Sequence, residues 1–171
     1  MRVVIISHTE HYRDKNDHIY GWGPTIRELN FLAQEEQITE LIHVAPLHKG
    51  EVPGSSMTYT EPNIRFESLK PSGGHGFKKL SLITHIPYNI SKSYRSCRQA
   101  ECSQFRAPTG IGMYVLPYLA LFKRNQYWVK YAGNWIDPDM PLGNKLQKKW
   151  LKYVAKCKVT INGNWEKNER I

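Results

Sequence analysis

The chain has 171 residues, of which 40% are hydrophobic and 23% charged, which fits a single soluble globular domain spanning residues 1–171 with a sizeable core. It contains no apolar run of about eighteen residues, which excludes a transmembrane helix, and the spacing of its three cysteines fits free thiols in a reducing cytoplasm better than a metal site. The net charge of +9 divides into −3 over residues 1–70 and +12 over residues 71–171, so the second half either contacts an anionic partner or is a solubilising surface.

The first half of the chain alternates apolar runs with polar loops. Arg2–Ser7 is a continuous apolar run, the pattern of a strand buried on both faces. Pro24 suits the first turn of a helix, which we expect to extend to about Glu36. Two further strands are expected at Glu40–Leu47 and Asn63–Leu69, separated from their neighbours by long loops at 8–23 and 48–62.

The second half continues the alternation. Helical periodicity runs from Phe77 to about Ala100, and Pro87 is expected to kink this helix or divide it. The remaining expected elements are a strand at 102–106, a helix at 110–123, a strand at 126–131, a helix at 142–156 and a strand at 157–161. Strands that alternate with helices predict a three-layer, Rossmann-like α/β sandwich with a mostly parallel sheet of about six strands.

Two of the expected strands end in polar, glycine-containing loops, at Cys102–Gly110 and Trp128–Trp135. In an open parallel sheet, such loops build a ligand crevice at the carboxyl edge. His8 directly follows the first strand and is expected to join this polar pocket. The turn Gly21–Trp22–Gly23 precedes a helix, where backbone N–H groups attract anions, so it is either a phosphate or sugar contact or a plain turn.

Several kinds of chemistry lack their sequence motifs. The chain has no P-loop, no Gly-x-Ser-x-Gly elbow and no Cys-x-x-Cys pair, and its glycine turn is not the Gly-x-Gly-x-x-Gly of dinucleotide-binding proteins. His8, His11 and His18 match no strong metal-binding spacing, so no metal is expected. We expect no cofactor.

The expected helix at 142–156 is basic and amphipathic. Its lysines fall within a narrow stripe, whereas Leu146, Trp150 and Val154 fall on the other side and are expected to face the sheet. This stripe is either a solvated face or a contact to the anionic surface of a membrane, and it comprises Lys145, Lys149, Lys152 and Lys156. Aromatic residues are not interleaved with the lysines as nucleic-acid stacking would require, so nucleic acid is not expected at this helix.

The order of these pieces resembles the N-terminal half of GT-B glycosyltransferases of the retaining family 4 type. The resemblance spans the chain and rests on several short strings, namely Arg2–Ser7, Gly21–Ala33, Gln104–Pro108, Tyr131–Trp135 and Val159–Gly163. Each string by itself is weak, but their order and spacing together are moderately specific. The resemblance implies a Rossmann-like acceptor-binding domain and places the chain in the cytoplasm, peripherally at the inner face of the membrane if the lysine stripe contacts lipid.

This resemblance implies an enzyme that transfers a hexose-type sugar from a nucleotide-sugar to a glycan or lipid-linked acceptor. Arg106 would be a fixed charge for phosphate or sugar hydroxyls, or else a structural partner of a carboxylate. Trp135 would offer a stacking face for a sugar ring. The full set of expected substrate-binding residues is His8, Gly21, Trp22, Gly23, Arg106, Gly133, Asn134, Trp135 and Asp137.

The chain departs from the family in two respects. Family members often carry a histidine in the loop after the strand at 126–131, whereas this chain has Ala132, so the catalytic residues stay unassigned. The family's second domain, which binds the nucleotide-sugar, has no counterpart in these residues. We therefore expect an isolated acceptor-binding domain, inactive by itself. The alternative is a non-catalytic α/β binding module for an anionic partner, either a membrane surface or nucleic acid.

Overall fold

The computed structural model describes residues 1–71, 81–122, 126–135, 137, 139–155 and 157–161. Along the chain, the elements are β1 (Arg2–Ile6), β2 (His11–Arg13), β3 (Ile19–Trp22), α1 (Gly23–Ala33), β4 (Glu40–Pro46), β5 (Ser56–Thr58), β6 (Ile64–Leu69), α2 (Ser81–Gln99), β7 (Cys102–Ala107), α3 (Gly112–Phe122), β8 (Gln126–Tyr131), α4 (Leu142–Tyr153) and β9 (Lys158–Ile161).

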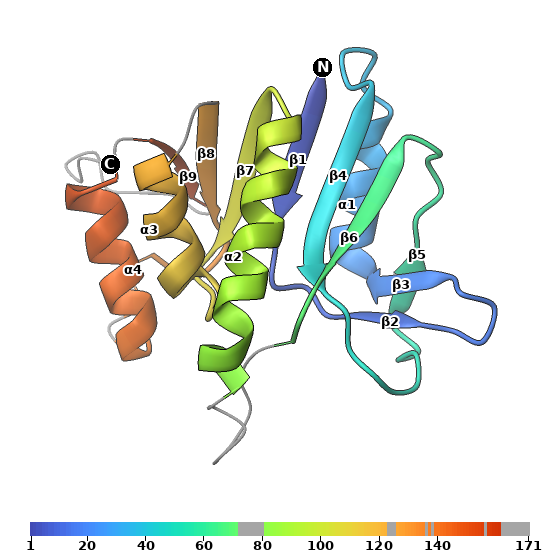
Figure 1. Ribbon diagram of the computed structural model, residues 1–171, viewed down its shortest axis with the longest axis horizontal. Helices are drawn as coiled ribbons and strands as arrows, with labels where there is room; N and C mark the ends of the chain where they lie inside the picture. The colour runs from blue at the N-terminus through green and yellow to red at the C-terminus, as the bar shows by residue number, and fades with distance from the viewer. Residues whose placement is uncertain (72–80, 123–125, 136, 138, 156, 162–171) are drawn as a thin grey trace.

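The central sheet contains six parallel strands in the order β6-β4-β1-β7-β8-β9 (Figure 1). Counted only among these six strands along the chain, the order is 3-2-1-4-5-6, the doubly wound arrangement of Rossmann-like proteins. All six strands lie where the sequence predicted them, and the fold is the expected α/β sandwich. The strand order changes direction between β1 and β7, so their loops diverge there and leave space at the carboxyl edge.

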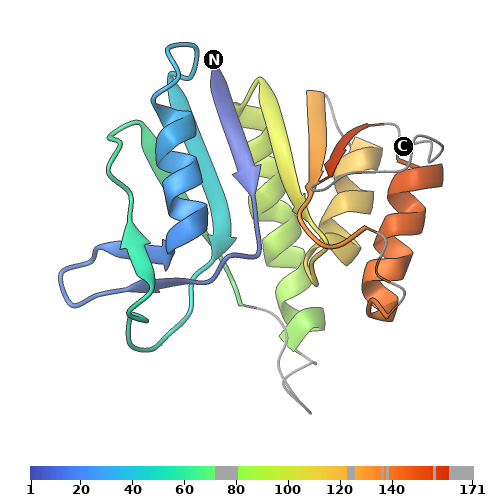
Figure 2. The ribbon, with the colours of Figure 1, turned by 180° about the vertical axis from the view of Figure 1, so that it is seen from behind.

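The two faces of the sheet have separate apolar cores, because successive side chains of a strand point to opposite faces. Val3 and Ile5 of β1 pack with Leu29 of α1 on one face. Val4 and Ile6 belong to a larger core on the opposite face, together with buried residues of β7, α3, β8 and α4. Figure 2 shows α1 in front of the sheet and α2 and α3 behind it. The prediction that the first strand is buried on both faces is therefore confirmed.

A second, antiparallel sheet of three short strands lies beyond the carboxyl edge, in the order β2-β3-β5. Sequence reasoning missed it and treated both segments as loops. The β2–β3 hairpin turns through Asp17, whose φ of 66° is left-handed, and both Asn16 and His18 donate backbone N–H bonds to Asp14 Oδ1. Strands of three or four residues in polar surroundings give too little alternation to be recognised.

The helices differ from the prediction mainly at their ends. α2 continues as one helix through Pro87 and is not divided there. Residues 77–80 of its expected start lie outside the described residues. α1 ends at Ala33, three residues before the predicted end, and α4 ends at Tyr153.

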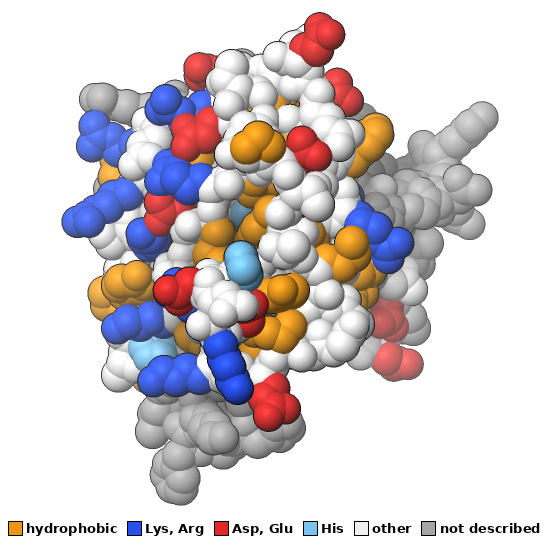
Figure 3. Space-filling view, turned by 90° about the vertical axis from the view of Figure 1, so that its right-hand side faces the viewer, with side chains coloured by type: hydrophobic (Ala, Val, Ile, Leu, Met, Phe, Trp, Pro, Cys, Tyr) orange, Lys and Arg blue, Asp and Glu red, His pale blue; other side chains and the backbone are white. Residues whose placement is uncertain are grey.

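The exposed edge of the central sheet at β6 carries ion pairs. Arg65 Nε lies 2.8 Å from Glu40 Oε1, and Arg2 Nε lies 2.7 Å from Glu40 Oε2. Glu67 also pairs with Arg65 and with Lys92 of α2. Figure 3, which looks onto this side of the molecule, shows basic and acidic side chains next to one another. Charged side chains on an edge strand discourage pairing with another chain.

Candidate functional site

A cleft of about 630 Å³ opens at the carboxyl edge of the central sheet, where the strand order reverses between β1 and β7. Its walls come from the β1–β2 segment, the start of α1, the segment that leads into β5, and the ends of β7 and β8. Its lining residues are His8, Thr9, Glu10, Tyr12, Trp22, Pro24, Thr25, Glu28, Pro53, Ser55, Ser56, Arg106, Lys130 and Ala132.

Three charged side chains meet in this cleft around the carboxylate of Glu28. Lys130 Nζ of β8 donates a 2.7 Å hydrogen bond to Glu28 Oε1, and Arg106 Nη2 of β7 lies 3.0 Å from the same oxygen. Arg106 also donates from Nε to Gln104 Oε1 at 3.3 Å. The Arg106–Glu28 contact satisfies the distance of an ion pair but not the angle of a hydrogen bond, so Nη2 keeps unused donor capacity.

The guanidinium of Arg106 is almost fully enclosed, with 9% of its side chain exposed. Burial lowers the pKa of Arg106, and the charge of Glu28 partly opposes that change. Arginine is so basic that it stays charged in this setting. The cleft therefore contains two cations and a carboxylate held in fixed positions by neighbouring strands and α1.

His8 lies at the mouth of the cleft, directly after β1. Burial lowers the pKa of His8, the positive charge of Arg106 lowers it further, and Glu10 opposes both effects. The imidazole is therefore neutral at pH 7, with one nitrogen that donates and one that accepts. The hydroxyls of Thr9 and Thr25 lie 3.4 Å apart beside it and extend the polar lining.

Three of the expected binding residues line the cleft. They are His8, Arg106 and Trp22, whose side chain is 55% exposed. The carboxylate partner that the sequence allowed for Arg106 is present as Glu28. Ala132, at the position where the resemblance would place a histidine, also lines the cleft and contributes only a methyl group.

The two glycines of the turn serve packing. A β-carbon on Gly21 would lie 2.4 Å from His11 Nε2, and one on Gly23 would lie 2.9 Å from the carbonyl oxygen of Ser55. The backbone N–H of Gly23 already donates to that oxygen at 3.2 Å. The backbone N–H of Gly23 is therefore already paired, and the turn joins α1 to the small sheet.

Ala132 is the residue after β8 that lines the cleft, whereas the four residues expected there from this loop do not line it. Trp135 is only 1% exposed and packs edge-on against Tyr131, with 4.8 Å between ring centroids, and Lys148 Nζ lies 5.0 Å over its ring. It is a core residue and cannot stack on a sugar, because its ring faces are covered. Gly133 packs against Pro108, and neither Asn134 nor Asp137 lines the cleft.

Sequence reasoning missed Glu28 and Lys130. A lysine within the apolar strand Trp128–Tyr131 was a usable signal, because charged residues in buried strands need a partner. Glu28 follows Pro24 by one helical turn and so faces the same way.

Behind the cleft wall, buried polar side chains form a continuous chain of hydrogen bonds. His11 Nδ1 lies 2.7 Å from the Thr9 carbonyl, which can only accept, so Nδ1 carries the proton and Nε2 accepts from the Tyr59 hydroxyl at 2.9 Å. The Tyr59 oxygen then accepts from His43 Nδ1 at 2.7 Å, and His43 Nε2 accepts from Ser7 Oγ at 2.8 Å. One direction of donation satisfies every member.

Both histidines of this chain of hydrogen bonds, His11 and His43, are neutral. Burial lowers the pKa of His11 to about 4, and burial with the nearby His11 and Arg106 lowers the pKa of His43 well below its usual range. Ser7 is fully buried and does not line the cleft. Its hydroxyl therefore cannot reach a substrate there as a nucleophile, although it bonds to His43. The chain of bonds links β1 and β4 of the central sheet to the small sheet.

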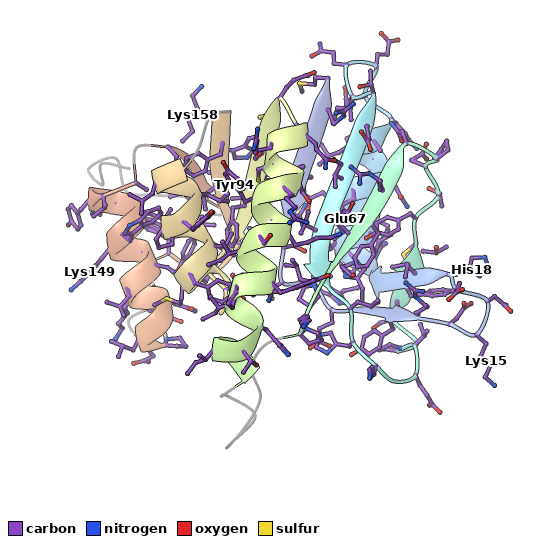
Figure 4. The ribbon with its side chains drawn as sticks, in the orientation of Figure 1. Lys15, His18, Glu67, Tyr94, Lys149 and Lys158 are labelled. Carbon is purple, nitrogen blue, oxygen red and sulfur yellow. The ribbon has the colours of Figure 1, made fainter. Side chains whose placement is uncertain are left out.

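The three histidines of the first loop do not converge. His8 lies in the cleft, His11 is buried, and His18 lies at the hairpin tip with Nδ1 3.3 Å from Asp14 Oδ2. Figure 4 shows His18 and Lys15 at this outer end. Within the described part of the chain, no group of three His, Cys, Asp or Glu side chains is placed to hold a metal ion.

The basic helix differs from its predicted orientation. Lys145 and Lys149 are exposed and Lys152 is half-buried, whereas Lys156 lies outside the described residues. Trp150 is half-buried and packs against the core as expected, whereas Leu146 and Val154 of the same predicted apolar side are exposed, and Gln147 and Leu151 are buried instead. Gln147 is buried because its side chain bonds both the N–H and the carbonyl of Thr109.

A scan of the chain against protein-family models found no match, and a search of curated proteins found no relative. The helices in the described residues include none that combines the length and apolar character needed to span a bilayer.

Proposed function

We propose that this chain is the acceptor-binding domain of a GT-B, nucleotide-sugar-dependent glycosyltransferase that transfers a hexose-type sugar to a glycan or lipid-linked acceptor. The observation that carries the proposal is the cleft at the strand-order reversal, with a cation-held carboxylate inside and an exposed tryptophan at its rim. Ligands of doubly wound sheets bind at this position. The family resemblance of the sequence strings supplies the reaction class.

The polar groups of the cleft suit a polyhydroxylated ligand. A sugar ring needs both donors and acceptors around it, and an aromatic side chain beside its apolar face. Glu28 uses Oε1 for both cations, which leaves Oε2 to accept a sugar hydroxyl. His8 and the two threonine hydroxyls both donate and accept, and Trp22 presents an exposed ring.

In this proposal, the residues of the chain bind and orient the acceptor. A separate domain binds the nucleotide-sugar and brings its anomeric carbon to the acceptor hydroxyl, and closure of the two excludes water. The neutral imidazole of His8 is placed to hydrogen-bond the attacking hydroxyl. The chain by itself then binds acceptors but transfers no sugar, and a rate of transfer above that of heat-killed protein would contradict this division of labour.

The proposal is tested by saturation-transfer NMR of the 171-residue protein with a panel of neutral glycans and glycolipid headgroups. We expect binding that Trp22→Ala and Glu28→Gln each weaken about ten-fold, which corresponds to about 1.4 kcal/mol. Asn134→Ala is the matched control, because Asn134 is exposed outside the cleft. No binding by any glycan, or equal loss in the control, would contradict the proposal.

The alternative proposal is a non-catalytic binding module for an anionic partner, with a membrane surface favoured over nucleic acid by the residues of α4. The observation in its favour is the pair of cations in the cleft, where Arg106 Nη2 has donor capacity to spare. Titration with inorganic phosphate separates the two. Tight phosphate binding that Arg106→Gln abolishes, without binding of neutral sugars, favours the module; the opposite preference favours the transferase domain.

A further inference from the structure

An apolar groove of about 400 Å³ lies between α3 and α4. Its walls are Met113 and Pro117 of α3 and Leu146, Trp150, Tyr153 and Val154 on and directly after α4. Leu146 is 48% exposed and Tyr153 is 74% exposed. A contiguous patch of large apolar side chains costs free energy in water, so it indicates a surface that is covered in use.

The same helix carries a one-signed charge. Residues 142–153 include four lysines and no acidic residue. Lys148 turns inward to the Trp135 carbonyl oxygen, whereas Lys145 and Lys149 are exposed and Lys149 also lines the groove. Figure 4 shows Lys149 at the outer side of α4, pointing away from the body of the protein. Apolar and cationic groups therefore reach solvent on the same side.

We propose that this α3–α4 face docks onto the surface of an anionic lipid bilayer. Tyr153, Leu146 and Val154 would lie at the boundary between headgroups and acyl chains, and Lys145 and Lys149 would contact headgroup phosphates. The Tyr153 ring suits this depth because it combines an apolar body with a polar tip. The lysines alone suggest attraction that salt reverses, but the exposed Leu146 and Val154 add a contribution that salt does not screen.

Charge complementarity selects the bilayer over a second copy of this chain. Two copies packed groove to groove about a two-fold axis would bring their lysines together, and like charges repel. The groove is also separate from the cleft. It lies on the helical layer, whereas the cleft lies at the carboxyl edge of the sheet, and the two have no lining residue in common. The proposal is thus independent of the function of the cleft.

Co-sedimentation with vesicles tests the proposal. The full 171-residue protein is mixed with vesicles of phosphatidylcholine alone or of phosphatidylcholine with phosphatidylglycerol, at low and high salt. We expect binding to the anionic vesicles only, reduced by salt but not abolished. Lys145→Glu/Lys149→Glu should weaken binding at low salt at least ten-fold, and Leu146→Ser/Tyr153→Ser should remove the fraction that survives high salt.

The matched control is Lys15→Glu/Lys49→Glu, which makes the same charge change at exposed positions distant from α4 in the sequence. It should bind like the wild type, and circular dichroism checks that every variant is folded. Absence of wild-type binding, equal binding by the α4 lysine variant, or equal loss in the control would overturn the proposal. So would a wild-type dimer in light scattering that Leu146→Ser/Tyr153→Ser dissociates, because the groove would then join two copies of the chain.

Discussion

Glu28 of α1 and Lys130 of β8 are 102 residues apart in the sequence, yet Lys130 Nζ donates a 2.7 Å hydrogen bond to Glu28 Oε1 across the cleft. With Arg106 at 3.0 Å from the same oxygen, one carboxylate fixes two cations on adjacent strands. The charges of the cleft are therefore positioned before any ligand arrives, which is the arrangement that reduces the cost of ordering on binding.

Neutralising this carboxylate should destabilise the protein. Glu28→Gln leaves Arg106 and Lys130 without a counter-charge, and because Arg106 is nearly enclosed, we expect a loss of about 1–3 kcal/mol in the free energy of unfolding. Urea denaturation measures it. Glu36→Gln serves as the control, because Glu36 is exposed and makes no ion pair with the described residues. It should change stability by less than about 0.5 kcal/mol. Equal stability of the two variants would show that the cations need no partner.

The buried histidines should make the protein sensitive to acid. The pKa of His11 is about 4 in the folded protein, below the ordinary value of 6.5 that applies when the chain unfolds. The unfolded chain therefore binds more protons between these values, so stability is fully present above pH 6.5 and falls as the pH drops toward 4, by up to about 3 kcal/mol from this group.

Denaturation series at several pH values test this difference. His11→Gln should be less stable than the wild type at pH 7.5 but should lose less stability between pH 6.5 and 4. Carboxylates titrate in both proteins, so the difference between their two slopes isolates the histidine. Parallel slopes would mean that His11 titrates alike in the folded and unfolded chains.

The hydroxyl of Tyr59 should contribute substantially to the free energy of unfolding, although the side chain is only half-buried. Tyr59→Phe removes the group between His43 Nδ1 and His11 Nε2, which leaves a buried donor and a buried acceptor unpaired. We expect a loss of about 2–3 kcal/mol in unfolding free energy. Tyr12→Phe is the comparison, because its hydroxyl bonds the exposed Glu10, and it should cost less than about 0.5 kcal/mol. A loss in Tyr59→Phe no larger than in Tyr12→Phe would contradict the role of the hydrogen-bond chain.

The two tryptophans that the sequence assigned to the binding site differ in burial. Trp135→Ala should cost about 3–5 kcal/mol, because it removes a fully buried ring, whereas Trp22→Ala should cost less than about 1 kcal/mol, because that ring is mostly in solvent. Thermal denaturation followed by circular dichroism distinguishes them. Near-equal melting temperatures would mean that the loop after β8 does not pack as described.

The sequence-based prediction is accurate where local patterns determine the structure, and it fails where contacts between residues far apart in the sequence determine it. The six central strands were predictable from local patterns, such as the apolar run Val3–Ile6 in β1 and the apolar–polar alternation at the start of β6. Trp135 was misplaced because a tryptophan beside glycine and asparagine looks like part of an exposed loop, whereas its burial comes from contacts with Tyr131 and with Lys148 of α4. Glu28 and Lys130 could not be paired from a single sequence, since nothing local couples residues so far apart. The burial of Leu146 was predicted wrongly, because helical periodicity shows which side of a helix is apolar but not which other element packs against that side.

The two sheets contribute differently to the cleft: the central sheet holds the charged residues, and the small sheet supplies one wall. Its strands come from the segments after β1 and after β4, and the 3-2-1-4-5-6 order of the central sheet would be complete without them. Tyr12, Trp22 and Ser56 belong to this small sheet and line one side of the cleft, while Arg106 and Lys130 project from the scaffold. Apart from His11 and Tyr59, which bond to the central sheet, these two segments can change in length and sequence while the charged centre is kept, so ligand choice can change without redesign of the core.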